Sequence, residues 1–242
     1  CGKSTFVRLI AGLIKSDSGK IIIDGDDITN KKFNTKILRR KLGIVFQFPE
    51  MQLFEQTIEK DIFFGLKQYK LTYDEKYKRA KETLELLGLD FEKIKDKSPL
   101  ALSGGEKRKI AVAGILVCKP KYLIFDEPIA GLDCNSRDSF MKLLLALKQN
   151  GTTIIIISHN TDYLAEYANR ILVMDDGKIV LDDKPNEIFN QTKLLNNLNI
   201  GVCNSKEIAN LLNKNGFNIQ SDILKYDDLL SSIISNIGVI ND

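Results

Sequence analysis

The chain has 242 residues, of which 43% are hydrophobic and 28% charged, enough for one large α/β domain or a domain with an appendage. Its formal net charge of +3 gives no argument for nucleic-acid binding. The four cysteines lie far apart without metal-ligand or disulfide spacing, which favours a reducing, cytoplasmic setting. No apolar run approaches the ~20 residues that a membrane span needs, so any membrane role is expected to be peripheral.

The chain opens on the second half of a phosphate-binding loop. Gly2-Lys3-Ser4 matches the end of the pattern G-x-x-x-x-G-K-[ST], and an amphipathic helix is predicted directly after it. Lys3 would neutralise the β- and γ-phosphates of a nucleotide, and the Ser4 hydroxyl would bind Mg²⁺. Thr5 and the N–H groups of residues 2–5 would cradle phosphate oxygens. Because the first half of the loop is missing, we expect an N-terminally truncated sequence that binds ATP poorly compared with the intact protein.

The next segments alternate short strands and helices. Residues 18–25 predict a short strand between turns, and residues 34–41 a basic short helix or turn. Residues 42–46 form a buried strand that ends at Gln47. Helical periodicity marks residues 58–69 and 74–87, the second of which stops at Gly88. With the segment through Gly114, these helices predict a helical subdomain at about residues 50–115.

A serine and two glycines then open another helix. Ser103, Gly104 and Gly105 precede the helical run that begins at Lys107. Glycines let a backbone approach a ligand closely, and the N–H groups at a helix start attract a phosphate. A helix capped by Ser103, with glycines that merely shape a turn, explains the same residues.

Two β-branched strands follow, each with polar residues at its end. The strand over residues 121–126 ends at Asp126 and Glu127, whose mutual repulsion calls for a cation or protons. The strand over residues 152–157 is predicted to be buried on both faces, and His159, the only histidine, lies at its carboxyl end. Asp133 is a candidate N-cap for a helix over residues 135–149. A helix over residues 161–168 and a hairpin around Asp176-Gly177 are predicted next.

In this order, the segments around Ser103, Asp126, Asp133 and His159 resemble the signature, Walker B, D-loop and H-loop motifs of the ATP-binding subunits of ABC transporters. The resemblance implies a P-loop NTPase α/β core with an inserted helical subdomain. It also implies a dimer, because in this family the signature motif (here Ser103, Gly104 and Gly105) serves the nucleotide of the partner subunit.

The resemblance further implies a role for each motif residue. Gln47 matches the Q-loop glutamine, whose amide oxygen can reach Mg²⁺ and the attacking water. Asp126 would hold Mg²⁺, and Glu127 would orient and deprotonate the water. His159 would contact the γ-phosphate, and Asp133 would link the two nucleotide sites. The family usually has Thr at the position of Ile129 and Asp at that of Asn160; neither departure removes a catalytic group.

The pattern around Gln47, continuing through residues 57–62, looks like the ATPases of energy-coupling factor importers, closer to the second of their two ATPase subunits. It implies an ABC ATPase domain at residues 1–185, a C-terminal extension at residues 186–242, and a peripheral place on the cytoplasmic face of the cell membrane. Expected partners are a second ATPase subunit, identical or paralogous, a transmembrane coupling protein and a substrate-binding membrane protein. The cargo, a vitamin or a cobalt or nickel ion, stays open.

Several alternatives remain at this stage. Apolar Met51, Leu53 and Phe54 suit either a groove for the membrane partner's coupling helix or packing on neighbouring helices. The apolar faces of the C-terminal helices suit a dimer contact, which we favour, or packing within the chain. A DNA-repair or chromosome-maintenance ATPase uses similar motifs but carries a long coiled coil that this sequence lacks. A nucleotide-binding regulatory module without turnover would not need Glu127 and His159.

Overall fold

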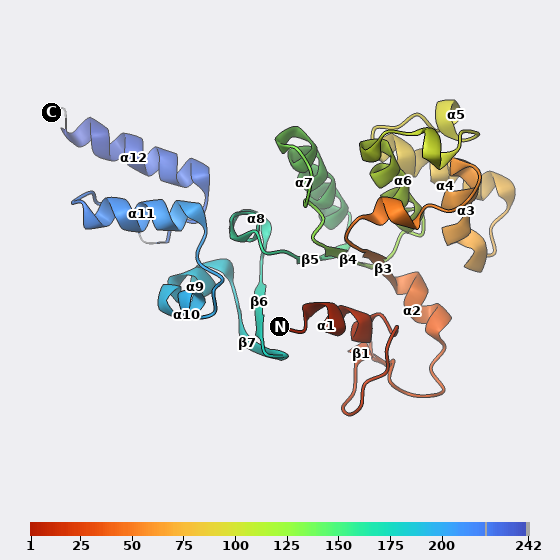
Figure 1. The fold of residues 1–242 in the computed structure, drawn as a ribbon, viewed down its shortest axis with the longest axis horizontal. Coiled ribbons are helices and arrows are strands. Elements are labelled where there is room, and N and C mark those ends of the chain that lie inside the picture. The colour runs from red at the N-terminus through yellow and green to blue at the C-terminus, as the bar shows by residue number, and fades with distance from the viewer. Residues whose placement is uncertain (221, 241–242) are drawn as a thin grey trace. The chain divides into compact units, whose positions relative to one another are not determined.

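The computed structural model describes residues 1–220 and 222–240 (Figure 1). They form two compact units, one of residues 4–157 and one of residues 1–3 with 158–242. The boundaries predicted from the motifs, residues 1–185 and 186–242, stay a prediction.

A parallel sheet organises the unit of residues 4–157. Its strands are β3 (Leu42–Val45), β4 (Tyr122–Asp126) and β5 (Thr153–Ile157), in the order β3-β4-β5. Leu123, Ile124 and Phe125 of the central strand, which is paired along both edges, are buried. All three strands lie where the sequence predicted them.

The burial predicted for the last strand is wrong. We expected β5 to be covered on both faces, but Ile155 is 37% exposed and its neighbours Ile154, Ile156 and Ile157 are only half-buried. The reason is position: β5 is an edge strand that pairs only with β4 among the described residues. A run of isoleucines reports β propensity and apolar character, but it does not report how many neighbours the strand has.

The first elements of the chain are short. Helix α1 spans Lys3–Ile10, and β1 (Ile22–Ile23) pairs antiparallel with β2 (Asp26–Asp27). Asp24 and Gly25 both have positive φ angles, 51° and 83°, as a two-residue hairpin turn requires. Helix α2 (Thr35–Lys41) is capped by Asn34, whose side chain accepts a hydrogen bond from the Lys36 N–H at 3.0 Å.

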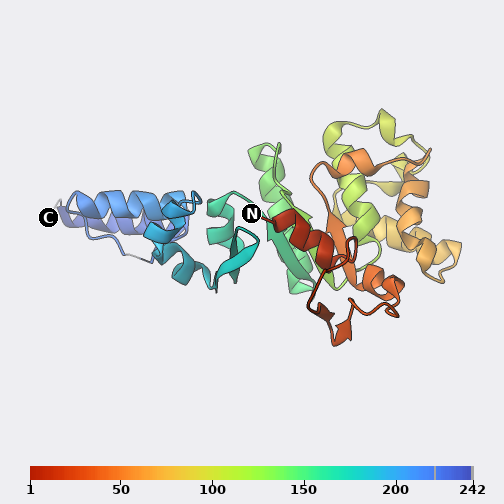
Figure 2. The same cartoon turned by 60° about the horizontal axis from the view of Figure 1, so that its bottom comes forward.

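A cluster of helices carries the residues predicted as the helical subdomain (Figures 1 and 2). Its α-helices are α3 (Ile58–Gly65), α4 (Tyr73–Leu86), α5 (Phe91–Ile94) and α6 (Gly104–Leu116). Their core consists of fully buried apolar side chains that include Ile58, Ile62, Leu84, Phe91 and Ile110. Short 3₁₀ turns at Pro49–Gln52, Leu66–Gln68 and Pro99–Ala101 connect the cluster.

Two helices pack on the sheet. Helix α6 approaches β3 so closely that a Cβ on Gly43 would stand 2.7 Å from an Ile115 side-chain carbon. Helix α7 (Cys134–Gln149) places Phe140 edge-on against Phe125 of β4, with ring centroids 5.5 Å apart. The helix that starts at the signature residues is therefore fixed against the sheet as well as within the helical cluster.

The second unit begins with helix α8 (Thr161–Tyr167) and the hairpin β6 (Ile171–Asp175) and β7 (Lys178–Asp183). Positive φ at Asp176 (43°) and Gly177 (73°) confirms the predicted turn. Helices α9 (Pro185–Asn190) and α10 (Thr192–Asn197) pack with them around a core containing Phe189, Leu195 and Cys203.

Helices α11 (Asn204–Lys214) and α12 (Tyr226–Ile240) complete this unit and lie side by side in both views (Figures 1 and 2). Ala209, Ile219, Ile223 and Leu229 form a small core beneath them, so part of their apolar surface packs within the chain. The side chains of Leu211 and Ile234 remain 60% and 61% exposed. Among the described residues, no helix is both long and apolar enough to cross a membrane.

The crossing of α3 and α6 generates a test of packing. A Cβ on Gly65 would stand 2.4 Å from the Gly114 carbonyl oxygen, which is backbone and cannot move aside cheaply. Gly65→Ala should therefore lower the free energy of unfolding by about 1–3 kcal/mol, measured by urea denaturation. Gly114→Ala is the matched control, because its Cβ would meet nothing closer than 4.0 Å. Equal urea midpoints for the two variants would contradict this packing.

Candidate functional site

The end of β4 holds the two predicted catalytic carboxylates. Asp126 is still paired in the sheet, in register with Ile157, while Glu127 has a left-handed backbone with φ 49°. The Glu127 N–H donates to the Ile157 carbonyl at 2.9 Å. A left-handed non-glycine residue costs about 1–3 kcal/mol and persists only where its surroundings impose it. The chain thus turns sharply between the two carboxylates, so that they occupy different backbone environments.

Gln47 follows β3 at the same side of the sheet, where the carboxyl ends of the parallel strands lie. Val45 is in register with Phe125, and the strands are parallel, so residues 46–47 and 126–127 leave the sheet together. Gln47 is exposed, and Phe48 after it is also left-handed, with φ 56°, before the turn Pro49–Gln52. The structure therefore brings Gln47, Asp126 and Glu127 to the carboxyl ends of neighbouring parallel strands.

The signature residues form a capped helix start. The Ser103 hydroxyl accepts from the Glu106 N–H at 3.3 Å, and the Glu106 carboxylate accepts from the Ser103 N–H at 3.0 Å and hydroxyl at 2.6 Å. These bonds lower the pKa of Glu106, because they favour its charged form. A Cβ on Gly104 or Gly105 would meet no atom within 4 Å, so both glycines lie open at the helix start.

The cap interpretation of Ser103 is thus confirmed, and its nucleotide role stays a prediction. The two are compatible. The cap uses the serine side chain and the Glu106 N–H, while the N–H groups of Gly104 and Gly105 at the helix start need no intrahelical partner and can meet a phosphate.

Asp133 likewise caps a helix. Its carboxylate accepts from the Ser136 N–H at 2.9 Å and from the Ser136 hydroxyl at 2.7 Å, at the start of α7. Those bonds lower the pKa of Asp133. The predicted N-cap is confirmed, and its link between nucleotide sites stays a prediction.

Two arginines that the sequence did not mark as functional hold the loop between Glu127 and Asp133. The Arg108 guanidinium of α6 donates to the Ala130 carbonyl at 3.0 Å and also to the Pro128 carbonyl. Arg137 Nε donates to the Leu132 carbonyl at 2.6 Å. No local pattern in the sequence marks these bonds, since Arg108 reaches carbonyls 20 and 22 residues away.

The phosphate-loop residues open α1. The helix begins at Lys3, so the N–H groups of Lys3, Ser4 and Thr5 belong to its first turn. Gly2 is left-handed with φ 90°, and a Cβ there would stand 3.3 Å from the Gly177 Cα of the β6–β7 turn. The Gly177 N–H donates to the Cys1 carbonyl at 3.2 Å, a contact that the sequence did not predict.

His159 lies in the turn between β5 and α8 and is exposed. On either side, the Ser158 hydroxyl accepts from the Asn160 N–H at 3.0 Å, and the Asn160 side chain accepts from the Tyr163 N–H at 3.1 Å to cap α8. Asn160 therefore does structural work as a cap. Gly2, Lys3 and His159 belong to the unit of residues 1–3 and 158–242, and the other predicted site residues belong to the unit of residues 4–157.

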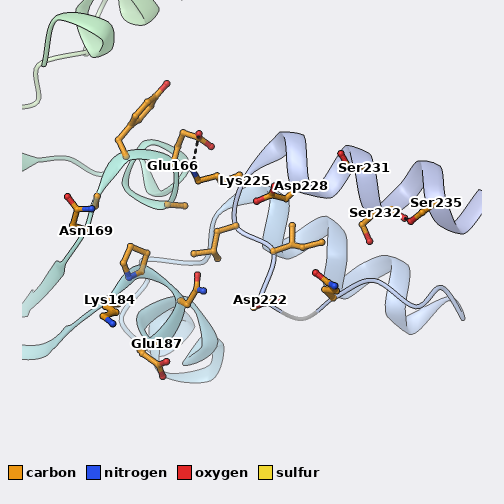
Figure 3. A pocket seen from close by; sticks show the side chains of 18 residues that line it. Glu166, Asn169, Lys184, Glu187, Asp222, Lys225, Asp228, Ser231, Ser232 and Ser235 are labelled. Atoms are coloured by element: carbon orange, nitrogen blue, oxygen red, sulfur yellow. Dashed lines mark hydrogen bonds and ion pairs between the residues drawn. The ribbon is translucent and has the colours of Figure 1, made fainter. Parts of the chain in front are cut away.

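A cavity of about 1070 Å³ lies elsewhere, between α8, α9 and the α12 region of the C-terminal unit (Figure 3). Its wall mixes charges and hydroxyls, and Glu166 and Lys225 pair across 3.7 Å. None of the predicted site residues lines this cavity. It is therefore separate from the motif residues.

Comparison with known proteins agrees with the motif order. The family profile described as "ABC transporter" matches residues 1–130. The energy-coupling factor transporter ATP-binding protein EcfA2 of Clostridium tetani is 43% identical over 234 residues, which cover 96% of this chain and 81% of that protein. The chain thus belongs to the ABC transporter family, among its energy-coupling factor ATP-binding proteins.

Solved structures agree with this placement. CbiO1 from Clostridium perfringens, part of the ABC transporter complex CbiONQ, is 38% identical with a TM-score of 0.70, covering 88% of this chain and 83% of that one. A second is the dimeric ATP-binding cassette MJ0796 in a post-hydrolysis state bound to ADP and phosphate. It is 28% identical with a TM-score of 0.65 and covers 76% of this chain and 81% of that one. The fold is that of ABC ATPases, P-loop NTPases that bind ATP.

Two capping boxes allow the structural and functional roles of Ser103 to be separated. Thr72 caps α4 with Glu75 as Ser103 caps α6 with Glu106. Ser103→Ala and Thr72→Ala should each lower the free energy of unfolding by about 1 kcal/mol, measured by urea denaturation. Only Ser103→Ala should also reduce the ATPase rate, because only its helix start is predicted to meet a nucleotide. Equal ATPase losses in the two variants would limit Ser103 to capping.

Proposed function

We propose that this chain is the ATP-hydrolysing subunit of an energy-coupling factor importer, and that it binds two ATP molecules in the seam of a dimer. The observation that carries the proposal is the turn at Glu127, which follows Asp126 at the sheet edge that also carries Gln47. Energising transport by ATP hydrolysis is the activity of the family to which the chain belongs.

In this proposal, one nucleotide is held by the chain's own motifs. Gly2, Lys3, Ser4 and Thr5 surround its phosphates at the start of α1, where helix N–H groups and the lysine charge favour anions. Glu127 accepts the proton of the attacking water, and Gln47 orients that water from the end of β3. His159 contacts the γ-phosphate.

Mg²⁺ fits the oxygen donors of this site. A serine hydroxyl at Ser4, an amide oxygen at Gln47 and a carboxylate at Asp126 are the hard ligands that Mg²⁺ takes, with water and phosphate oxygens completing the shell. When bound, the ion would neutralise charge on the β- and γ-phosphates. The positive charge of the ion would also reduce the electrostatic repulsion between the adjacent carboxylates of Asp126 and Glu127.

A second ATPase subunit completes each site. The open glycines Gly104 and Gly105, with Ser103, would close on the nucleotide of the partner, and Asp133 would lie at the contact between the two sites. The dimeric state of the MJ0796 relative supports this arrangement. The partner is an identical chain or a paralogue.

The membrane partner would dock on an apolar surface next to Gln47, formed by Phe48, Met51, Phe54 and Phe64. Met51 is 84% exposed and Phe54 is 64% exposed. The loop is nevertheless fixed: the Asp61 carboxylate accepts from the N–H groups of Phe54 (3.3 Å) and Glu55 (3.1 Å). Burial raises the pKa of Asp61. Leu53 is half-buried and Phe54 packs edge-on against Phe64 of α3, with ring centroids 4.8 Å apart, so part of the loop packs within the chain, while the exposure of Met51 favours a docking role.

With this surface engaged, the dimer would work at the cytoplasmic face of the cell membrane. Integral partners, a transmembrane coupling protein and a substrate-binding protein, would turn closure of the dimer into uptake of a vitamin or a transition-metal ion such as cobalt or nickel.

Replacing the proposed base tests the reaction. Glu127→Gln keeps the size and hydrogen bonding of the side chain but cannot accept a proton, so ATP turnover of the full-length protein should fall by about 10²–10⁴-fold. ATP-dependent dimerisation, followed by light scattering, should persist because binding groups are untouched. Turnover near the wild-type rate would remove Glu127 from its assigned role. A monomer at saturating ATP would argue against the shared seam.

The docking surface has its own test. Met51→Glu should prevent copurification of the integral membrane partners, because burying a charge in an apolar contact is costly. Its basal ATPase rate should stay within about twofold of wild type, since a substitution on an exposed surface has little effect on stability. Leu86→Glu, on the exposed face of α4, is the control and should retain the partners. Retention of the partners by the Met51 variant would place the docking site elsewhere.

A further inference from the structure

One arginine joins three segments that the motifs treat as separate. Arg108 lies on α6, five residues after Ser103, and is half-buried. Its two terminal nitrogens reach the carbonyls of Pro128 and Ala130, in the turn directly after Glu127. The turn Pro49–Gln52, directly after Gln47 and Phe48, packs against the same helix.

The turn after Glu127 leaves two backbone carbonyls for the Arg108 guanidinium to bind. The turn after Glu127 is closed by the Ala130 N–H, which donates to the Glu127 carbonyl at 3.2 Å. That leaves the Pro128 and Ala130 carbonyls as acceptors, and Pro128 is buried. The planar fork of an arginine satisfies both at once, which a single ammonium or amide group cannot do with the same geometry.

Charge from the loop after Gln47 supports this position. Burial lowers the pKa of Arg108, and the negative charge of Glu50 acts in the opposite direction. Glu50 Oε2 is buried without a hydrogen-bond partner among the described residues. The Glu50 carboxylate therefore stabilises the half-buried guanidinium mainly through its charge, and links the loop to the arginine.

We propose that Arg108 is a positioning residue for ATP hydrolysis, which fixes the backbone after Glu127 and couples the general base to the signature helix and the loop after Gln47. The inference rests on the proposed role of Glu127 and deepens it. Because α6 is a single rigid element, a displacement of its start by the partner's nucleotide is passed through Arg108 to the turn that sets Glu127. A nucleotide in one site thereby affects the base of the other.

The positioning role predicts a specific kinetic signature. Arg108→Gln in the full-length protein should lower kcat by about 10- to 100-fold, because a catalytic group misplaced by about 1 Å can lose that much. The dissociation constant for ATP should stay within about twofold, since the hydrogen bonds of the Arg108 side chain go to Pro128 and Ala130, neither of which is a predicted nucleotide-binding residue. Arg108→Lys should recover part of kcat, because an ammonium can still donate to one of the two carbonyls.

Two further measurements separate positioning from simple stability. Arg79→Gln is the matched control: its guanidinium lies 5.9 Å over the Tyr69 ring, and its kcat should be unchanged. Combined with Glu127→Gln, the Arg108→Gln change should cause no additional loss of turnover, because it acts through that carboxylate.

Some results would overturn the inference. They are a wild-type kcat for Arg108→Gln, a loss of kcat matched by an equal loss of ATP affinity, or a full further loss of turnover in the double variant. Failure of the proposed function looks different: the unmodified protein would not hydrolyse ATP, or Glu127→Gln would remain active.

Discussion

The parallel pairing of β3 with β4 is the constraint on which the proposed site depends. The two strands are paired in register, from Leu42 with Tyr122 to Val45 with Phe125. Their carboxyl ends therefore lie side by side. There the segments after the two strands turn through left-handed residues, Phe48 and Glu127, instead of continuing the sheet. Strain of this kind is stable only on a rigid base, which the buried β4 provides. The amide of Gln47 and the carboxylates of Asp126 and Glu127 consequently lie at the carboxyl end of the same sheet.

Helix α6 connects that end of the sheet to the rest of its unit. Its start is capped by Ser103, its second turn sends Arg108 to the Pro128 and Ala130 carbonyls, and its later turns pack against β3 at Gly43 and α3 at Gly65. The close approaches at the two glycines leave little room for the helix to slide. A displacement of its first turn is therefore expected to reach the two carbonyls that Arg108 binds from the next turn, since packed helices move as rigid bodies.

Several residues have both a structural and a proposed functional role. Ser103 and Asp133 cap helices through their side chains, and Asn160 caps α8 beside His159. Capping and nucleotide contact do not compete, because a cap satisfies only some of the N–H groups at a helix start. Because one residue can fill both roles, the local folding signals and the chemical motifs of this sequence fall on the same positions.

Local signals in the sequence were sufficient for much of the fold. The Asp176-Gly177 pair predicted a hairpin turn, Ser103 and Asp133 predicted helix starts, and apolar β-branched runs predicted β3, β4 and β5. The motif order was sufficient for the family. These features depend on residues that are neighbours in the chain, so their physical causes are visible in the sequence itself.

Tertiary structure alone decided the rest. The exposure of Ile155, the contact of Cys1 with Gly177, the crossing at Gly65 and Gly114, and the reach of Arg108 to Pro128 all depend on distant segments. A sequence pattern states what a residue can bond or bury. Which neighbour it meets is fixed only when sheet register and helix packing place remote backbone atoms within a few ångströms.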